Sequence, residues 1–393
     1  MKLLFINVEN YHGFSQYIAE ELKKLGHEVV IFDKLRSAVG EMSLQSLIPN
    51  MNYHVNKGNP LSLANFLKFV RPIVGELDYD LIFLEQALIY WDNDVDIPVV
   101  YYHRDIWSEC FMKNPDMLLY RFKKHRDSLR YISRRTWGMT RWKLRFLNGV
   151  HLPRFKPNRR KDFKGLNFIS TRIPFKNYMK MDLVQADYYR HVYRMMETMK
   201  KKGIATVHDY EKMEFPEYKE VLERCEAVVT IHGKDAPVTR RAYETAACRG
   251  IMVLWLQNDE SKRTYEEIGL KHGYNCLMFR KVNQLPQIWK VCNNRKAIAQ
   301  KGFEWVQNRH TYEVRAKELE KVFEDFLREF HAVKPCPQCG KEMTMSDGYF
   351  SDCCRLNRDQ ILAMDKGLMN RQDKEVAAEE IIVRELQKIK EGK

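Results

Sequence analysis

Short apolar runs along the chain alternate with amphipathic stretches, a pattern that predicts an α/β protein. The apolar runs predict strands at residues 2–8, 28–32, 81–84, 98–102, 167–170, 227–231, 251–256 and 276–279. The amphipathic stretches predict helices at about 15–25 and 61–76, and Gly26 is placed to end the first of them. Strands that alternate with helices usually pair in parallel, so we expect two Rossmann-like, doubly wound domains.

Residues 239–254 (TRRAYETAACRGIMVL) combine a polar start, a helix of small residues, a glycine and an apolar strand. In an α/β protein this order places Arg240, Arg241 and Glu244 at the N-terminal end of a helix that faces a cleft. Arginines and backbone N–H groups at such an end suit a phosphate, and a carboxylate suits ribose hydroxyls. An ordinary amphipathic helix before a buried strand would give the same pattern.

The composition is that of a globular protein, and 393 residues are enough for two domains and an appendage. The apolar run at the start is too short for a signal peptide. The sequence contains no run of about 18 apolar residues, so no transmembrane segment is predicted. Five of the nine cysteines are scattered, and the other four lie within 336–354. This clustering indicates metal ligands rather than disulfides, in a reducing cytoplasm.

The positive charge is concentrated in one block. Residues 121–161 contain fifteen Lys and Arg but a single acid, Asp127, which equals the net charge of +14 of the whole chain. Aromatic residues interleave with these bases, and such a block is typical of a polyanion site, either for nucleic acid or for an anionic membrane. A solvated pair of lysine-rich helices is the alternative. The residues expected to contact the polyanion are Arg134, Arg135, Trp137, Arg141, Trp142, Lys143 and Arg145.

Several segments resemble, in the same order, motifs of glycosyltransferases with the B-type fold. Residues 239–254 resemble the donor-binding signature E-A-x-A-C-G-x-P-V, and 147–157 (LNGVHLPRFKP) resemble the interdomain connector N-G-V-D-x-x-x-F-x-P. Residues 170–176 (STRIPFK) are similar to the G-R-x-x-x-x-K loop, with one residue fewer between the two bases. Residues 11–15 resemble the G-x-S loop. Residues 295–315, with the motif at 310–315, resemble the closing helices of cytosolic and spore-associated members.

The resemblance covers about residues 1–330 and implies the domain organisation. It predicts an acceptor-binding domain at 1–155, a nucleotide-sugar-binding domain at 156–330 and an appendage at 331–393. It further implies transfer of a sugar from a nucleotide-sugar, a UDP-sugar, to an acceptor hydroxyl. Retaining enzymes of this fold work without a catalytic metal, so none is expected.

The resemblance also assigns roles to residues of the donor site. Arg172 and Lys176, with the backbone at Arg240 and Arg241, would stabilise the leaving diphosphate. Glu244 aligns with the second glutamate of an E-x7-E motif that holds the donor ribose. The first glutamate would fall at Ala236, so the pattern is broken there, and Asp235 lies one position away.

Three further residues are candidates for contacts with the sugars. Gly13 permits close approach of the backbone to a phosphate or sugar, although a tight turn would also require glycine. His103 and Asp105 follow a predicted strand and are candidates for contacts with the transferred sugar or the acceptor hydroxyl. A histidine satisfied at a strand end is the alternative for His103.

The appendage carries an incomplete finger motif. Cys336-Pro-Gln-Cys339 is typical of a zinc knuckle, whereas Phe350 stands where a zinc-ribbon or treble-clef finger has its third cysteine. Cys353 and Cys354 are the candidates to complete a structural zinc site, and a metal-free finger is the alternative. Residues 356–393 are predicted to form a helical tail.

Together these patterns predict a glycosyltransferase whose acceptor is a nucleic acid with hydroxylated bases, such as hydroxymethylated bacteriophage DNA. One alternative is a transferase for a surface or spore polysaccharide that docks on an anionic membrane. The other is a nucleic-acid-binding protein that keeps the transferase fold without turnover, which the missing acid at Ala236 would favour.

Overall fold

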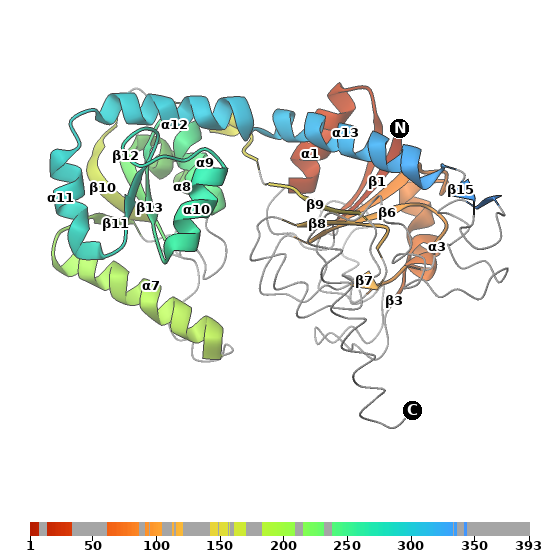
Figure 1. Cartoon of the computed structure of the whole chain (residues 1–393), viewed down its shortest axis with the longest axis horizontal. Coiled ribbons are helices and arrows are strands. Elements are labelled where there is room, and N and C mark those ends of the chain that lie inside the picture. Colours follow the sequence, from red (N-terminus) through yellow and green to blue (C-terminus); the bar gives the residue numbers. More distant parts are fainter. Residues whose placement is uncertain are drawn as a thin grey trace. The chain divides into compact units, whose positions relative to one another are not determined.

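The structure, a computed structural model, describes two compact units of the chain (Figure 1). The first unit is formed by Met1–Phe146 with Ala316–Lys393, and the second by Leu147–Arg315. The residues described are 1–7, 14–33, 61–85, 91–93, 95–103, 112–113, 115–120, 142–147, 149–155, 157, 161–169, 183–208, 215–231, 238–332, 334–335 and 342–343.

The first unit contains a parallel sheet whose strand order is β2-β1-β4-β6-β8-β9. Its strands are β1 (Lys2–Asn7), β2 (Glu28–Asp33), β4 (Leu81–Glu85), β6 (Val99–His103), β8 (Met117–Tyr120) and β9 (Trp142–Arg145). Its helices are α1 (Phe14–Lys24), α3 (Leu63–Val74) and α13 (Tyr312–Phe330), the last of which begins in the second unit. Two small sheets consist of β3 (Leu61–Ser62), β5 (Trp91–Asp92) and β7 (Met112–Lys113), and of β15 (Lys334–Pro335) and β16 (Glu342–Met343).

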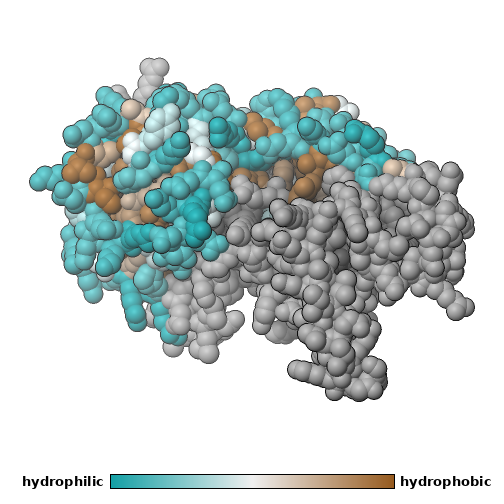
Figure 2. All heavy atoms as spheres, in the orientation of Figure 1, coloured by the Kyte–Doolittle hydropathy of each residue, from teal (hydrophilic) through white to brown (hydrophobic). Residues whose placement is uncertain are grey.

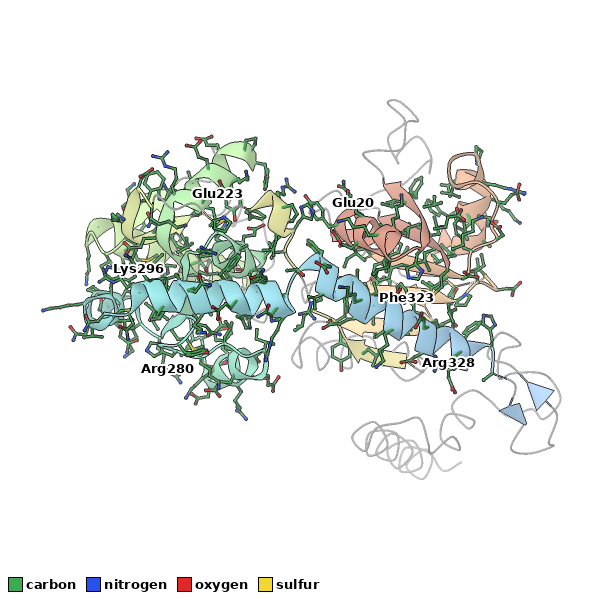
Figure 3. All side chains as sticks on the ribbon, turned by 90° about the horizontal axis from the view of Figure 1, so that it is seen from above. Glu20, Glu223, Arg280, Lys296, Phe323 and Arg328 are labelled. Carbon is green, nitrogen blue, oxygen red and sulfur yellow. The ribbon has the colours of Figure 1, made fainter. Side chains whose placement is uncertain are left out.

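Both faces of the first sheet are buried, which explains its almost uninterrupted apolar strands. Successive side chains of a strand point to opposite faces, so Leu4 and Ile82 pack in the cluster that contains α3. On the other face, the rings of Phe5 and Phe83 stack with centroids 4.6 Å apart, and Phe323 of α13 lies 6.0 Å from Phe83. Figures 1 and 3 show α13 running along this face.

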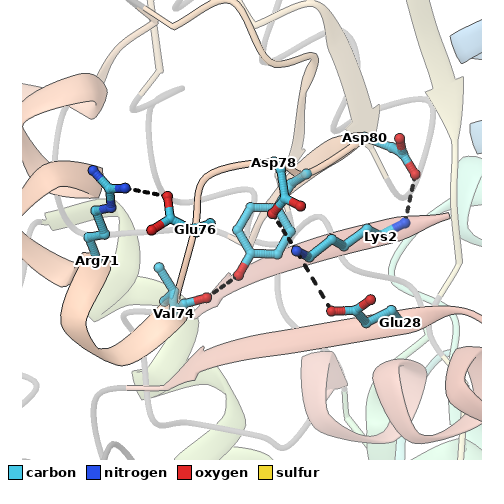
Figure 4. Close-up of polar contacts among 8 residues, drawn as sticks. Lys2, Glu28, Arg71, Val74, Glu76, Asp78 and Asp80 are labelled. Carbon is cyan, nitrogen blue, oxygen red and sulfur yellow. Dashed lines mark hydrogen bonds and ion pairs between the residues drawn. The ribbon is translucent and has the colours of Figure 1, made fainter.

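Polar contacts fix the amino end of β1 to the chain before β4 (Figure 4). The backbone N–H of Lys2 donates to Asp80 Oδ2 at 2.7 Å, and the N–H of Asp80 donates to the Lys2 carbonyl at 2.8 Å. The Lys2 ammonium pairs with Asp78 and lies 3.8 Å from Glu28 of β2. The hydroxyl of Tyr79 donates to the Val74 carbonyl at the end of α3. The three adjacent strands β2, β1 and β4 are therefore held in one register at this edge.

The second unit contains a parallel sheet whose strand order is β11-β10-β12-β13-β14. Its strands are β10 (Phe163–Ile169), β11 (Thr206–His208), β12 (Cys225–Thr230), β13 (Ile251–Trp255) and β14 (Leu277–Phe279). Its helices are η1 (Leu152–Arg154), α7 (Leu183–Lys201), α8 (Phe215–Arg224), α9 (Arg240–Ala247), α10 (Asp259–Glu267), η3 (Val282–Gln284), α11 (Leu285–Val291) and α12 (Arg295–Arg309). Met195 and Met199 of α7 pack on one face of the sheet, and α9 packs against β12 and β13.

The surface of the second unit is mostly hydrophilic in the view of Figure 2. Among its described residues, the large apolar side chains that are exposed are Tyr274 at 54% and Val291 at 61%. Apolar side chains that are exposed singly are normal on protein surfaces. None of the helices in the described ranges is long and apolar enough to cross a membrane.

Two segments that the sequence analysis treated separately meet in the second unit. The N–H of Val150 donates to the His310 carbonyl at 2.8 Å, and the N–H of Tyr312 donates to the Val150 carbonyl at 3.1 Å. A Cβ atom on Gly149 would lie 3.0 Å from backbone atoms of Thr311 and Tyr312, so only glycine fits without a shift. The connector-like segment therefore pairs with the chain just before α13.

The predicted α/β class with two parallel, Rossmann-like sheets is confirmed, because both large sheets are parallel. The alternative interpretation of the basic block, a pair of lysine-rich helices, does not hold for residues 142–145, which form strand β9. Trp142, Leu144 and Phe146 alternate with bases, a two-residue period that favours a strand. The predicted domain boundaries at 155 and 330 stay predictions. The finger and the helical tail predicted after 331 also stay predictions, because most of 331–393 lies outside the described residues.

The structure predicts a loss of stability at acidic pH that involves His272. Its Nδ1 atom accepts a hydrogen bond from the N–H of Met278 at 2.8 Å, and burial lowers its pKa. Since the unfolded chain then binds the proton more readily, the free energy of unfolding should fall as the pH drops below about 6.5. Burial also lowers the pKa of His208, which acts in the same direction.

The variant His272→Asn keeps an acceptor near the position of Nδ1 but cannot titrate. We expect it to lose less stability than the parent between about pH 7 and about pH 5, as measured by urea denaturation. The exposed Gln287→Asn is the control, because neither side chain titrates, and it should leave the pH dependence unchanged. An identical pH dependence in the parent and in His272→Asn would contradict this assignment.

Candidate functional site

The strand orders locate a candidate site at the carboxyl edge of each sheet. In the second unit the chain runs from β10 outward to β11 and then returns to β12 on the other side of β10. The first sheet reverses in the same way between β1 and β4. In open α/β sheets, ligands bind at the carboxyl ends of the strands that flank such a reversal.

Helix α9 follows β12 at this edge of the second sheet. It packs closely because its inward positions are small, and all of Ala242, Ala246 and Ala247 are fully buried. Its N-cap residue Thr239 is extended and makes no side-chain capping bond. The helix ends in a turn in which Arg249 takes a positive φ of 54°. A Cβ atom on Gly250 would lie 3.0 Å from the Thr245 side chain, so a larger residue there would need a small shift.

Glu244 of α9 is buried, with 3% of its surface exposed, and both of its oxygens are engaged. Arg240 Nε lies 2.8 Å from Oε1, and the hydroxyl of Tyr218 on α8 donates to Oε2 at 2.5 Å. A carboxylate has about four acceptor positions, so these two partners leave capacity for a ligand hydroxyl. The sequence has alanine at 236, where the family motif has its first glutamate. In the structure, Glu244 is paired with one basic and one phenolic side chain.

Arg241 joins the same group of side chains. Its Nη1 donates to the carbonyl of Ile169, the last residue of β10, at 2.8 Å, and its guanidinium also hydrogen-bonds the Tyr218 hydroxyl. Burial, and then the charge of Glu244, raise the pKa of Tyr218 well above its usual value. Tyr218 therefore stays protonated at neutral pH, accepts from Arg241 and donates to Glu244.

Two hydroxyls near this edge lack a hydrogen-bond partner among the described residues. They belong to Thr230, at the end of β12, and Thr239, before α9. Thr230 is 1% exposed, and a buried hydroxyl is normally paired with protein or a bound molecule. The chain between these two threonines, which includes Asp235, lies outside the described residues.

Lys161 holds the other ends of α8 and α9. Its Nζ donates to the carbonyls of Glu223, near the end of α8, and of Cys248, after α9, both at 2.7 Å (Glu223 is labelled in Figure 3). Burial lowers the pKa of Lys161 and raises the pKa of the nearby Cys225 thiol to about 12. A thiol of such high pKa is not a nucleophile at neutral pH, so this cluster is structural.

At the reversal point of the first sheet, a serine and a glutamate are paired. Ser15, in the first turn of α1, donates to Oε2 of Glu85 at the end of β4, and both side chains are fully buried. Ser15 lies in the predicted G-x-S loop, whereas Glu85 was not among the predicted site residues. Glu85 follows the apolar residues of β4, and a polar residue at the end of a strand is common, so the sequence did not indicate a functional role for it.

Of the predicted site residues, the structure describes the side chains of Arg240, Arg241 and Glu244 and brings them together. His103 ends β6, and Trp142, Lys143 and Arg145 lie in β9, but only their backbones are described. The others lie outside the described residues: Gly13, Asp105, Arg134, Arg135, Trp137, Arg141, Arg172, Lys176, Asp235, Cys336, Cys339, Cys353 and Cys354. Within the described ranges, no group of three or more His, Cys, Asp or Glu is placed to hold a metal.

The fold is similar to that of solved glycosyltransferases. Sucrose-phosphate synthase from Thermosynechococcus elongatus has a TM-score of 0.56 at 14% identity, over 83% of this chain and 98% of that one. A glycosyltransferase from Rickettsia africae has a TM-score of 0.52 at 11% identity, over 83% and 98%. Anabaena HepE in complex with UDP and glucose has a TM-score of 0.50 at 12% identity, over 83% and 100%.

No protein-family model and no curated protein matches this sequence. At these low identities, the structural likenesses show the fold alone: mixed α/β with two parallel sheets, consistent with the two Rossmann-like domains of B-type glycosyltransferases.

The position of Lys161 predicts a large effect of its removal. Lys161→Met keeps the aliphatic chain but leaves two carbonyls without their charged donor, so the free energy of unfolding should fall by about 2–4 kcal/mol. The exposed Lys164→Met of β10 is the control and should change it by less than about 0.5 kcal/mol. Urea denaturation measures both, and equal effects of the two substitutions would refute the capping role.

Proposed function

We propose that this protein transfers a sugar from a UDP-sugar to an acceptor hydroxyl, with retention and without a catalytic metal. The observation that carries the proposal is the paired Glu244 beside Arg240 and Arg241, at the reversal point of the second sheet. Fixed cations there suit a diphosphate, and the carboxylate suits ribose hydroxyls. The fold shared with solved glycosyltransferases supports the same activity.

In this proposal the donor binds to residues 156–330 and the acceptor to residues 1–155. Negative charge grows on the diphosphate as the glycosidic bond breaks. Arg172 and Lys176 stabilise it, assisted by the backbone at Arg240 and Arg241. Glu244 accepts hydrogen bonds from the ribose, with Asp235 as the displaced second acid. Gly13 admits the sugar or phosphate, and His103 and Asp105 contact the transferred sugar or the acceptor hydroxyl.

A hydroxymethylated DNA is the acceptor that we propose. The support is the sequence block at 121–161, whose charge equals that of the whole chain and whose bases are interleaved with aromatic residues. Lys and Arg side chains at this density neutralise phosphates, and aromatic side chains stack on exposed nucleobases. Cys336, Cys339, Cys353 and Cys354 are proposed to hold a structural zinc in the appendage.

The donor is tested with a panel of UDP-, GDP- and ADP-sugars. We expect consumption of a UDP-sugar and a thermal shift with UDP, and Glu244→Gln should raise the KM for the donor by about tenfold or more, because a charged acceptor is lost. Glu217→Gln, an exposed acid of α8, is the control and should behave like the parent. Absence of both turnover and a UDP-dependent shift would overturn the proposed activity.

The acceptor is tested by incubation with hydroxymethylated or unmodified duplex DNA, followed by mass spectrometry of the nucleosides. We expect a glycosylated nucleoside with the hydroxymethylated substrate alone, and binding that weakens steeply with salt. The double variant Arg134→Ala/Arg135→Ala should reduce the slope of log affinity against log salt by about two, whereas Lys200→Ala/Lys201→Ala should not. Retention on anionic liposomes without any binding to DNA would favour the polysaccharide alternative.

A further inference from the structure

Tyr218 connects two residues that the sequence analysis assigned to different parts of one ligand. Its hydroxyl accepts a hydrogen bond from Arg241 and donates to Glu244 Oε2 at 2.5 Å. Arg241 is anchored in turn by the carbonyl of Ile169 at the end of β10. The three side chains therefore form one continuous network from the edge of the sheet to the carboxylate.

The geometry also determines the direction of each hydrogen bond in this network. A guanidinium is always a donor and an ionised carboxylate is always an acceptor, so the hydroxyl of Tyr218 must accept from Arg241 and donate to Glu244. Burial raises the pKa of Tyr218, which keeps the proton on the phenol over the whole physiological range. Arg240 occupies the other oxygen, Oε1, at 2.8 Å, so the carboxylate is held from two sides.

We propose that Tyr218 is a positioning residue that orients Glu244 for the ribose of the donor, and thereby sets the preference for a ribonucleotide over its deoxy forms. This inference rests on the proposed function. A carboxylate held in one rotamer binds a ribose hydroxyl without first losing conformational freedom. Without the Tyr218 hydroxyl, Oε2 of the buried Glu244 carboxylate lacks its donor, and the side chain would turn toward another hydrogen-bond partner. Tyr218 touches neither sugar nor phosphate in this scheme and acts through Glu244.

The test compares the binding of UDP with that of its 2′-deoxy and 3′-deoxy forms by isothermal titration calorimetry of the full chain. The parent should prefer UDP over at least one deoxy form by about tenfold or more. In Tyr218→Phe the affinity for UDP should fall, while the affinity for the deoxy form that the parent discriminates against stays nearly constant. The preference for UDP over that form should therefore shrink to about threefold or less. A purely structural role would weaken the binding of both nucleotides equally.

Tyr265→Phe is the matched control, because Tyr265 is a fully buried tyrosine of the same unit whose hydroxyl donates to the Trp255 carbonyl at 3.1 Å. It should keep the preference of the parent. Arg241→Lys is the second variant, because a lysine cannot bridge the Ile169 carbonyl and the Tyr218 hydroxyl as a guanidinium does. It should weaken the binding of all three nucleotides and also reduce the preference.

The outcomes separate this inference from the proposed function. If the parent binds UDP with the expected preference and Tyr218→Phe keeps it, the positioning role is refuted and the proposed function stands. If the parent binds UDP without preference, Glu244 does not recognise the ribose and the inference is refuted as well. If the parent does not bind UDP at all, both the inference and the proposed donor are overturned.

Discussion

The buried carboxylate of Glu244 is the constraint on which the candidate site depends. An ionised carboxylate cannot be buried without partners, because its desolvation costs several kcal/mol. Arg240 and Tyr218 supply these partners, and Arg241 links Tyr218 to the end of β10. A single negative charge thus holds together a strand and the two helices α8 and α9. The same helices are held at their C-terminal ends by the ammonium of Lys161. Both ends of the pair are therefore fixed by charged hydrogen bonds rather than by apolar packing alone.

The sequence predicted the fold well where hydrophobicity is periodic and poorly where it is not. The strands with long apolar runs, such as β4 and β13, were predicted within one or two residues. The short edge strand β11 was missed, because it has only three residues, none of them buried, and so shows no clear alternation of apolar and polar positions. Strand β9 was missed because its dense basic residues conceal the alternation of Trp142, Leu144 and Phe146.

The candidate site was predicted in part for a related reason. Arg240, Arg241 and Glu244 lie in one contiguous motif, and the structure brings them together. Tyr218 comes from another helix, 26 positions before Glu244, and its buried spacing with Leu222 indicates only a core face. Contacts through space of this kind have no local signature in a single sequence. The same limit applies to Glu85, whose partner Ser15 lies 70 positions away.

Helix α13 has a consequence for how the chain acquires its structure during synthesis. The first unit is discontinuous, since its apolar face around Phe83 is covered by Phe323, which is made only after the whole second unit. The ribosome therefore synthesises the whole second unit before Phe323 is available to cover the sheet of the first. Until then, the nascent N-terminal sheet exposes one apolar face, and exposed apolar surface of this kind is what chaperones bind.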